Sequence, residues 1–219
     1  LRHLQALDMS ELEFRDYSWM TRSPRSLTSF LIIHLFDGSV NLPSSLIHFD
    51  ADYIEIWRQT FVSKLPPCLE SFEGRRKFFG ACVVIPLLPP STRKLSIGYR
   101  VQCELSEQEL FEKFPKFLTS LQVRVYLNGI DFKSNPELTV LFPPTLTDLN
   151  LQIELPCSAW PLLPQQLTRL SCRVPDACDI PSTLNQSYFP PQLTHLTMLS
   201  LELTPEAAQL LPSSLTFLR

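Results

Sequence analysis

Residues 141–151 read Leu-Phe-Pro-Pro-Thr-Leu-Thr-Asp-Leu-Asn-Leu, and this sequence pattern recurs along the whole chain. The shared phrase is an apolar residue followed by Pro-x-x-Leu-x-x-Leu-x-apolar, with very similar copies at residues 163–172, 189–198 and 211–218. Neighbouring copies lie 19 to 28 residues apart, as measured between their anchor prolines Pro24, Pro43, Pro66, Pro89, Pro115, Pro143, Pro164, Pro190 and Pro212. Repetition at such a period predicts an array of similar units, each packed only on its neighbours.

The apolar positions within each copy alternate, as Leu149 and Leu151 do. This period of two places one face of a short strand in a core and turns the intervening residue outward. Leu1-Arg2-His3-Leu4-Gln5-Ala6 fits the same template without its proline, and we interpret it as a tenth copy in a chain that continues beyond this sequence. We therefore expect one array over residues 1–219, with nine or ten parallel strands.

Two return segments carry helix-start signals. Ser106 with Glu109 forms a capping box, which predicts a helix over Glu107–Phe114 that ends before Pro115. Thr204 before Pro205 predicts a second helix over Pro205–Leu211. The expected unit is a strand, a loop, a short helix and then Leu-Pro before the next strand.

With these repeats the chain resembles the leucine-rich repeat proteins. The Leu-Pro-x-x-Leu-x-x-Leu pattern is similar to the repeats of bacterial effectors with a Leu-Pro-x-Leu-Pro turn and to the FNIP-type repeats of amoeboid eukaryotes. Two features depart from these patterns: Tyr126, Glu154 and Pro175 replace the usual Asn, so no buried Asn ladder is expected, and the Phe-Asn-x-Pro-Ile phrase is missing. The resemblance implies an α/β solenoid with a curved parallel sheet on its concave face and loops and short helices on its convex face. It also implies a protein partner, and in some relatives a separate ligase domain that these residues do not contain.

Charge and composition indicate which classes of partner and which location to expect. The formal net charge of −3 lacks the basic excess that nucleic-acid binding requires. The longest apolar run, residues 78–88, is shorter than the roughly 20 residues that cross a bilayer, and Pro86 interrupts it. We expect a cytoplasmic protein, although the sequon Asn185-Gln186-Ser187 keeps a secreted or surface location as the alternative.

No motif typical of hydrolases, zinc proteases or phosphate-binding loops occurs, so we expect neither an enzyme nor a cofactor. His3, His48 and His195 fall on one outward template position in separate repeats, too far apart to converge on one metal ion. His34 follows an apolar run and is interpreted as a loop or edge residue.

The six cysteines show no Cys-x-x-Cys pair and are expected to be reduced structural thiols. Cys172 takes the inward position that Leu151 fills one repeat earlier. A bridge between Cys172 and Cys178 remains the alternative in an oxidising compartment. The run Arg75-Arg76-Lys77 is interpreted as a solvated sheet edge, with docking of phosphate or an acidic peptide as the alternative.

The outward strand positions form the candidate partner-binding face, which is acidic early and basic from Arg75 through Arg124. We expect a protein partner with an acidic stretch to bind there. A structural subunit of a larger assembly, contacting its neighbours through convex loops, is the alternative. The candidate residues are His48, Asp50, Arg75, Lys94, Arg124, Asp148, Asn150, Arg169, Arg173 and His195.

Overall fold

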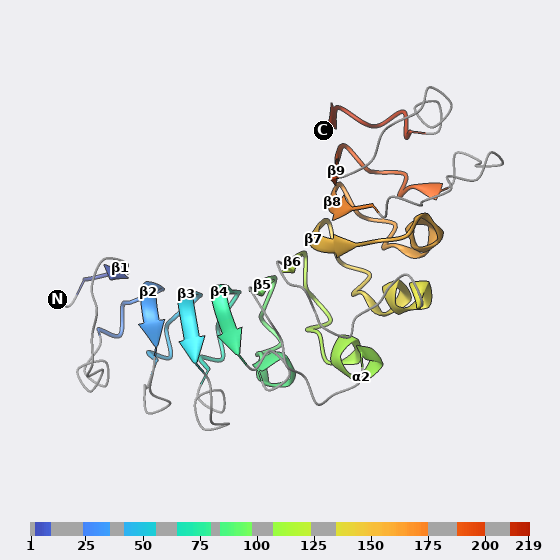
Figure 1. Cartoon of the computed structure of the whole chain (residues 1–219). Helices are drawn as coiled ribbons and strands as arrows, with labels where there is room; N and C mark the ends of the chain where they lie inside the picture. The colour runs from blue at the N-terminus through green and yellow to red at the C-terminus, as the bar shows by residue number, and fades with distance from the viewer. Residues whose placement is uncertain are drawn as a thin grey trace.

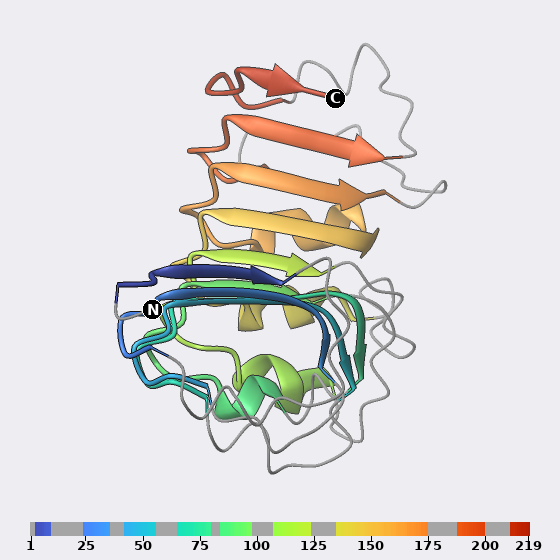
Figure 2. The ribbon, with the colours of Figure 1, turned by 90° about the vertical axis from the view of Figure 1, so that its left-hand side faces the viewer.

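The computed structural model describes residues 3–9, 24–35, 42–55, 65–79, 84–97, 107–123, 135–174, 188–199 and 211–219. Within these ranges the strands form a ten-stranded parallel sheet in which spatial order follows chain order, which confirms the predicted solenoid (Figure 1). Figure 2 shows the later strands stacked with their arrows pointing the same way. The strands are β1 (Ala6–Met9), β2 (Ser29–Leu35), β3 (His48–Glu55), β4 (Ser71–Phe79), β5 (Lys94–Ile97), β6 (Ser120–Val123), β7 (Asp148–Glu154), β8 (Arg169–Arg173), β9 (His195–Leu199) and β10 (Phe217–Leu218).

All nine anchor prolines make the same turn. The proline carbonyl accepts a hydrogen bond at 3.0–3.1 Å from the backbone N–H three residues later. Proline presets its own φ, so the chain enters each of the nine strands from β2 to β10 from the same geometry. In the copy after Pro89 the third residue is Thr92 instead of Leu, and its buried hydroxyl donates to the Leu69 carbonyl at 3.3 Å.

The core lies behind the sheet and is built from registered rows of inward side chains. Rings stack along one row, with centroids 6.0 Å apart between Phe30 and Phe49 and 5.8 Å apart between Phe49 and Phe72. Leu149 and Leu170 continue this row and are 0% and 2% exposed. The alternation seen in the sequence therefore predicts the inward row correctly, although outward Ser71 and Ser96 are also buried and inward Leu218, on the last strand, is 45% exposed.

Short helices cover the outer side of the core (Figure 1). They are η3 (Ile85–Leu87), α2 (Glu107–Glu112), η4 (Pro136–Leu141) and η5 (Cys157–Leu162). α2 ends two residues before the predicted Phe114, because the Phe114 N–H bonds the Phe111 carbonyl at 3.2 Å in a tighter turn that buries both rings. Ser106 and the second predicted helix, Pro205–Leu211, lie outside the described residues.

The sheet lies on the inner side of a curve, and the bend is most visible around β5 to β7 (Figure 1). Parallel strands are spaced at ~4.8 Å, whereas a helix with its side chains is ~10 Å wide. Wider elements on the outer side therefore open the stack there and make the sheet concave. α2 and η4 occupy that outer side at the bend.

The first copy differs from its prediction. Ala6 pairs with Ser29 and Leu7 with Phe30, so the copy reads Leu4-x-x-Leu7, three residues later than the predicted Leu1-x-x-Leu4. Both phases satisfy the local pattern, but the later one lets the Ser26 hydroxyl donate to the Leu4 carbonyl at 2.8 Å. His3 consequently precedes β1 and does not share the outward position of His48.

Candidate partner-binding face

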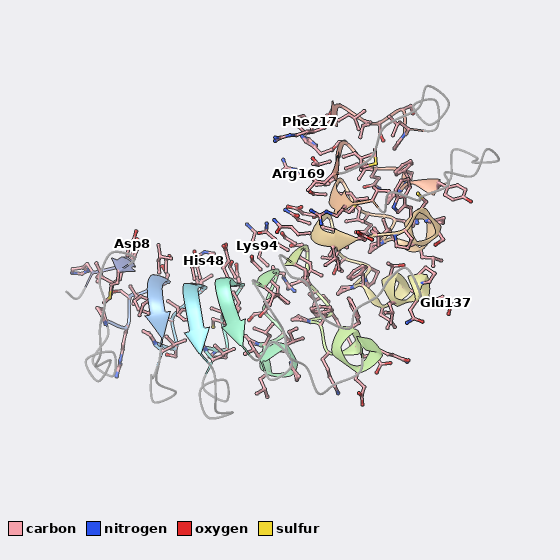
Figure 3. The ribbon with its side chains drawn as sticks, in the orientation of Figure 1. Asp8, His48, Lys94, Glu137, Arg169 and Phe217 are labelled. Carbon is pink, nitrogen blue, oxygen red and sulfur yellow. The ribbon has the colours of Figure 1, made fainter. Side chains whose placement is uncertain are left out.

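The concave face consists of registered rows of outward side chains, with neighbours in a row ~4.8 Å apart. In Figure 3 the labelled side chains of Asp8, His48, Lys94, Arg169 and Phe217 lie on the inner side of the curve, whereas Glu137 of η4 lies on the outer side. The first row is Ala6, Ser29, His48, Ser71, Lys94, Ser120, Asp148, Arg169, His195 and Phe217. The second is Asp8, Leu31, Asp50, Glu73, Ser96, Gln122, Asn150, Ser171 and Thr197.

Most of the candidate residues belong to this face. The exposed ones are His48, Lys94 and Arg169, and the half-buried ones are Asp50, Asp148, Asn150, Arg173 and His195. The backbone of Arg75 belongs to β4, but its side chain lies outside the described part of the chain, as does the whole of Arg124. The basic centre predicted around these two residues therefore stays a prediction, and Lys94 is its described member.

Lys94 and Arg169, the exposed cations of the described face, form no ion pair with the described carboxylates. Asp148 is the direct cross-strand neighbour of Arg169, yet the two form no salt bridge, and Lys94 forms none with any described side chain. His195 is held differently: its Nδ1 lies 2.9 Å from the Thr194 hydroxyl, and its ring stacks on Phe217 with the centroids 5.7 Å apart.

Two register shifts change which side chains meet across strands. Simple alternation would place Gln152 opposite Arg173, but a shift between β7 and β8 places Glu154 there instead. The Arg173 Nε atom is buried, with no hydrogen-bond partner among the described residues. A second shift, between β3 and β4, pairs Tyr53 with Lys77, so the run Arg75-Arg76-Lys77 lies at a bulge. Bulges re-aim side chains, which a period of two does not predict.

A row of threonine hydroxyls ties the repeats together where the chain enters the strands, and sequence reasoning missed it. Each hydroxyl donates at 3.0–3.1 Å to the backbone carbonyl at the equivalent position one repeat earlier. The signal was visible as the recurring Leu-Thr-x-Leu. We call this row the threonine ladder: Thr28, Thr119, Thr147, Thr168, Thr194 and Thr216.

A second set of hydroxyls lies two residues before this ladder. Ser or Thr there donates at 2.7–2.8 Å to the carbonyl of the Leu just before the ladder position in the preceding repeat, at Ser26, Ser45, Ser91, Thr145 and Ser214. These bonds cross between repeats at the same edge as the proline turns. The entry edge of the sheet is therefore fixed by both backbone and side-chain hydrogen bonds, which holds the concave face rigid.

One aromatic contact also lies on this entry edge. The Arg93 Cζ atom stands 5.0 Å from the centroid of the Phe117 ring, and the Arg93 Nη1 donates to the Phe117 carbonyl at 3.3 Å. Phe117 is nevertheless 55% exposed, and Lys116 beside it is exposed as well. Arg93 and Phe117 come from different repeats, so no motif in the sequence marks the pair.

The cysteines correct one expectation. Cys157 is disulfide-bonded, so the prediction of six reduced thiols is wrong at that residue. Cys68 is free and exposed, while Cys172 is free and buried in its predicted inward position. The alternative bridge between Cys172 and Cys178 is therefore not formed. Burial raises the pKa of Cys172 to about 12, which keeps its thiol neutral and unreactive.

The described residues form neither a metal centre nor a membrane-spanning helix. Across the described ranges, no three His, Cys, Asp or Glu side chains are grouped so as to hold a metal ion. Among the helices that the structure describes, none has the length and apolar character needed to span a bilayer.

No protein-family model matches the chain, and no curated protein matches it either. Among solved structures, the leucine-rich repeat-containing protein LegL7 from Legionella pneumophila is similar at 12% identity, with a TM-score of 0.57 over 98% of this chain and 82% of that one. The circular leucine-rich repeat protein CroV588 is 22% identical with a TM-score of 0.42, and this chain spans 34% of its length. Likeness at such identity concerns the fold alone. Together with the proline turns and the ten registered strands, the match to LegL7 shows that the chain has the fold of a leucine-rich repeat solenoid.

Proposed function

We propose that this chain is a protein-interaction module without chemistry of its own, and that it binds a protein partner across its concave face. The observation that supports this most is the pair of exposed cations Lys94 and Arg169, which project from hydrogen-bonded strands and have no ion-pair partner among the described side chains. Cations left unpaired on a fixed surface are available to a ligand.

The size of the face suits a protein. Ten strands at ~4.8 Å extend over about 43 Å, and four residues per strand at ~3.3 Å add about 13 Å of width. The projected area is therefore about 600 Å², while a standard interface buries about 800 Å² on each partner. Because side chains roughen the surface beyond its projection, a partner that covers the face approaches the standard size.

Rigidity favours binding at this face. The threonine ladder and the proline turns fix the strands before any partner arrives. Side chains that project from ordered strands lose less conformational freedom on association than side chains on loops, so less of the contact energy is spent on ordering them.

The charges favour an acidic stretch on the partner. Lys94 and Arg169 lie three strand spacings apart, about 14 Å, which an extended acidic segment of four or five residues spans. Asp148 lies between them in the row and weakens the field without pairing with either cation. Arg75 and Arg124 extend the positive region if their side chains point as the sequence predicts.

A structural subunit of a larger assembly is the second candidate, because large apolar side chains are exposed on the outer side. Leu87 of η3 is 44% exposed, Val140 of η4 is 61% exposed and Leu162 of η5 is 37% exposed. An assembly that packed on the outer helices would bury these three residues.

Site-specific photo-crosslinking separates the two candidates. A crosslinking residue is introduced at Ser120 on the concave face or at Glu137 on η4, and the captured protein is identified from each position. We expect one protein to crosslink from Ser120 and not from Glu137. Capture from Glu137 alone would favour the structural subunit.

Charge reversal of the captured complex gives the second test. Lys94→Glu combined with Arg169→Glu should slow association about tenfold at low salt, because electrostatic steering is lost. Lys113→Glu, an exposed cation just after α2, is the matched control and should leave the rate unchanged. The double variant reverses two charges and Lys113→Glu reverses one, so a Lys113→Glu effect on the logarithm of the rate half as large as that of the double variant would mean that only net charge matters and would refute binding at the concave face.

A further inference from the structure

We propose that Arg93 and Phe117 form an anchor for an acidic segment of the partner, at the edge where the chain enters β5 and β6. The proposal rests on the proposed function and extends the interface from the concave face onto this edge. It commits to one occupant, a carboxylate-bearing stretch of protein.

The geometry leaves the Arg93 guanidinium ready to bind. Its carbon stands 5.0 Å from the Phe117 ring centroid, and one N–H donates to the Phe117 carbonyl at 3.3 Å. A guanidinium carries five N–H donors, so most of them remain without a partner among the described residues. A planar guanidinium fixed against an aromatic ring is suited to bidentate binding of a carboxylate.

Both residues are fixed by their backbones. The Arg93 carbonyl accepts hydrogen bonds from the Thr119 N–H at 2.8 Å, the Ser120 N–H at 3.0 Å and the Thr119 hydroxyl at 3.1 Å. Phe117 lies inside the Pro115 turn, next to Leu118, which is fully buried. The pair therefore needs little ordering when a ligand binds.

The surrounding charges favour an anion. Lys94 and Lys116 are exposed sequence neighbours of Arg93 and Phe117 respectively. The acidic residue next to Arg93 across the strands is Glu70, whose backbone carbonyl accepts a hydrogen bond from the Arg93 N–H at 2.7 Å. The Glu70 side chain is exposed and forms no salt bridge with Arg93. The chain's net charge of −3 disfavours nucleic acid as the anion. Protein carboxylates fit the site better.

The anchor is continuous with the concave face. Arg93 is followed directly by Lys94, the first residue of β5, whose side chain lies on the inner side of the curve in Figure 3. Arg and large aromatic residues are also the types that dominate binding energy at interfaces, and Phe117 keeps 55% of its surface exposed. One extended acidic segment can therefore contact the face and the edge together.

Fluorescence anisotropy with defined peptides tests the anchor. The probe is a fluorescein-labelled peptide of Glu residues around a central Leu, compared with a peptide in which Gln replaces every Glu. The chain should bind the Glu peptide more tightly. Arg93→Lys keeps the charge but loses the planar fork, and it should weaken binding about tenfold; Phe117→Ala should weaken it about threefold. Arg25→Lys, at an exposed position in the Pro24 turn, is the matched control and should change binding less than twofold.

The outcomes separate this proposal from the broader one. If Lys94→Glu with Arg169→Glu abolishes peptide binding while Arg93→Lys and Phe117→Ala do not alter it, the concave face stands and the anchor is wrong. If Arg93→Lys and Phe117→Ala weaken binding but Lys94→Glu with Arg169→Glu does not, the concave-face proposal fails. The anchor's role in that interface then fails with it. Equal affinity for the Glu and Gln peptides overturns the anchor outright. Melting temperatures should stay unchanged in all variants, because the substituted side chains are exposed.

Discussion

Replacing Thr147 with Val tests the threonine ladder, because Val keeps the branched shape and removes only the hydroxyl. That hydroxyl donates to the Thr119 carbonyl at 3.1 Å. The same carbonyl still accepts the N–H groups of Thr147 at 2.9 Å and Asp148 at 3.1 Å, so no buried acceptor is left unsatisfied. The loss should therefore equal one net hydrogen bond, about 1 kcal/mol of unfolding free energy. Removing Thr168 and Thr194 as well should bring the loss to about 3 kcal/mol if the three act independently.

Urea denaturation measures this loss. With an m-value of about 2.5 kcal/mol/M, the single variant should lower the unfolding midpoint by about 0.4 M and the triple variant by about 1.2 M. Thr197→Val is the matched control, since Thr197 lies outward on β9 and its hydroxyl bonds no other described residue. If Thr147→Val and Thr197→Val shift the midpoint equally, or if the triple variant is no less stable than the single one, the ladder contributes nothing and the reasoning fails.

Four further results are expected. Leu149→Asp or Leu170→Asp should destabilise the chain by several kcal/mol, because each buries an unpaired carboxylate, and an unchanged melting temperature would contradict the inward register. Iodoacetamide should label exposed Cys68 in the folded chain but Cys172 only after unfolding, as mass spectrometry of the labelled peptides would show. The pKa of Cys172 rises from 9.0 to about 12 on folding, so above pH 9 the unfolded state loses this proton before the folded state does. The free energy of unfolding should therefore fall as the pH rises from 9 to about 12, and it should fall less in Cys172→Ala. The slower association of the Lys94→Glu and Arg169→Glu variant should disappear at high salt in stopped-flow measurements, since screening removes the steering field.

Local rules were sufficient for the repeating unit. Proline presets φ whatever surrounds it, and the chain makes the same turn at all nine anchor prolines. Alternation of Leu with polar residues in Leu149-Asn150-Leu151 predicted one buried and one outward face, because successive strand side chains point to opposite sides. The parallel order and the outward placement of Lys94 and Arg169 followed from these two rules.

The remaining features depend on contacts between repeats, which no local pattern specifies. Leu1-Arg2-His3-Leu4 and Leu4-Gln5-Ala6-Leu7 satisfy the template equally well, and pairing with β2 selects the second. The bulge that brings Glu154 opposite Arg173 arises from the register between β7 and β8. Cys157 is disulfide-bonded, which no sequence motif indicated. Arg93 contacts the Phe117 ring, 24 residues later in the chain, through the lateral packing of separate units. Sequence alone therefore determined the repeating unit and the face that it presents. Tertiary packing decided the phase of the first copy, the bulges and the side chains that contact each other across repeats. These contacts depend on how far each return segment carries the chain before the next strand begins.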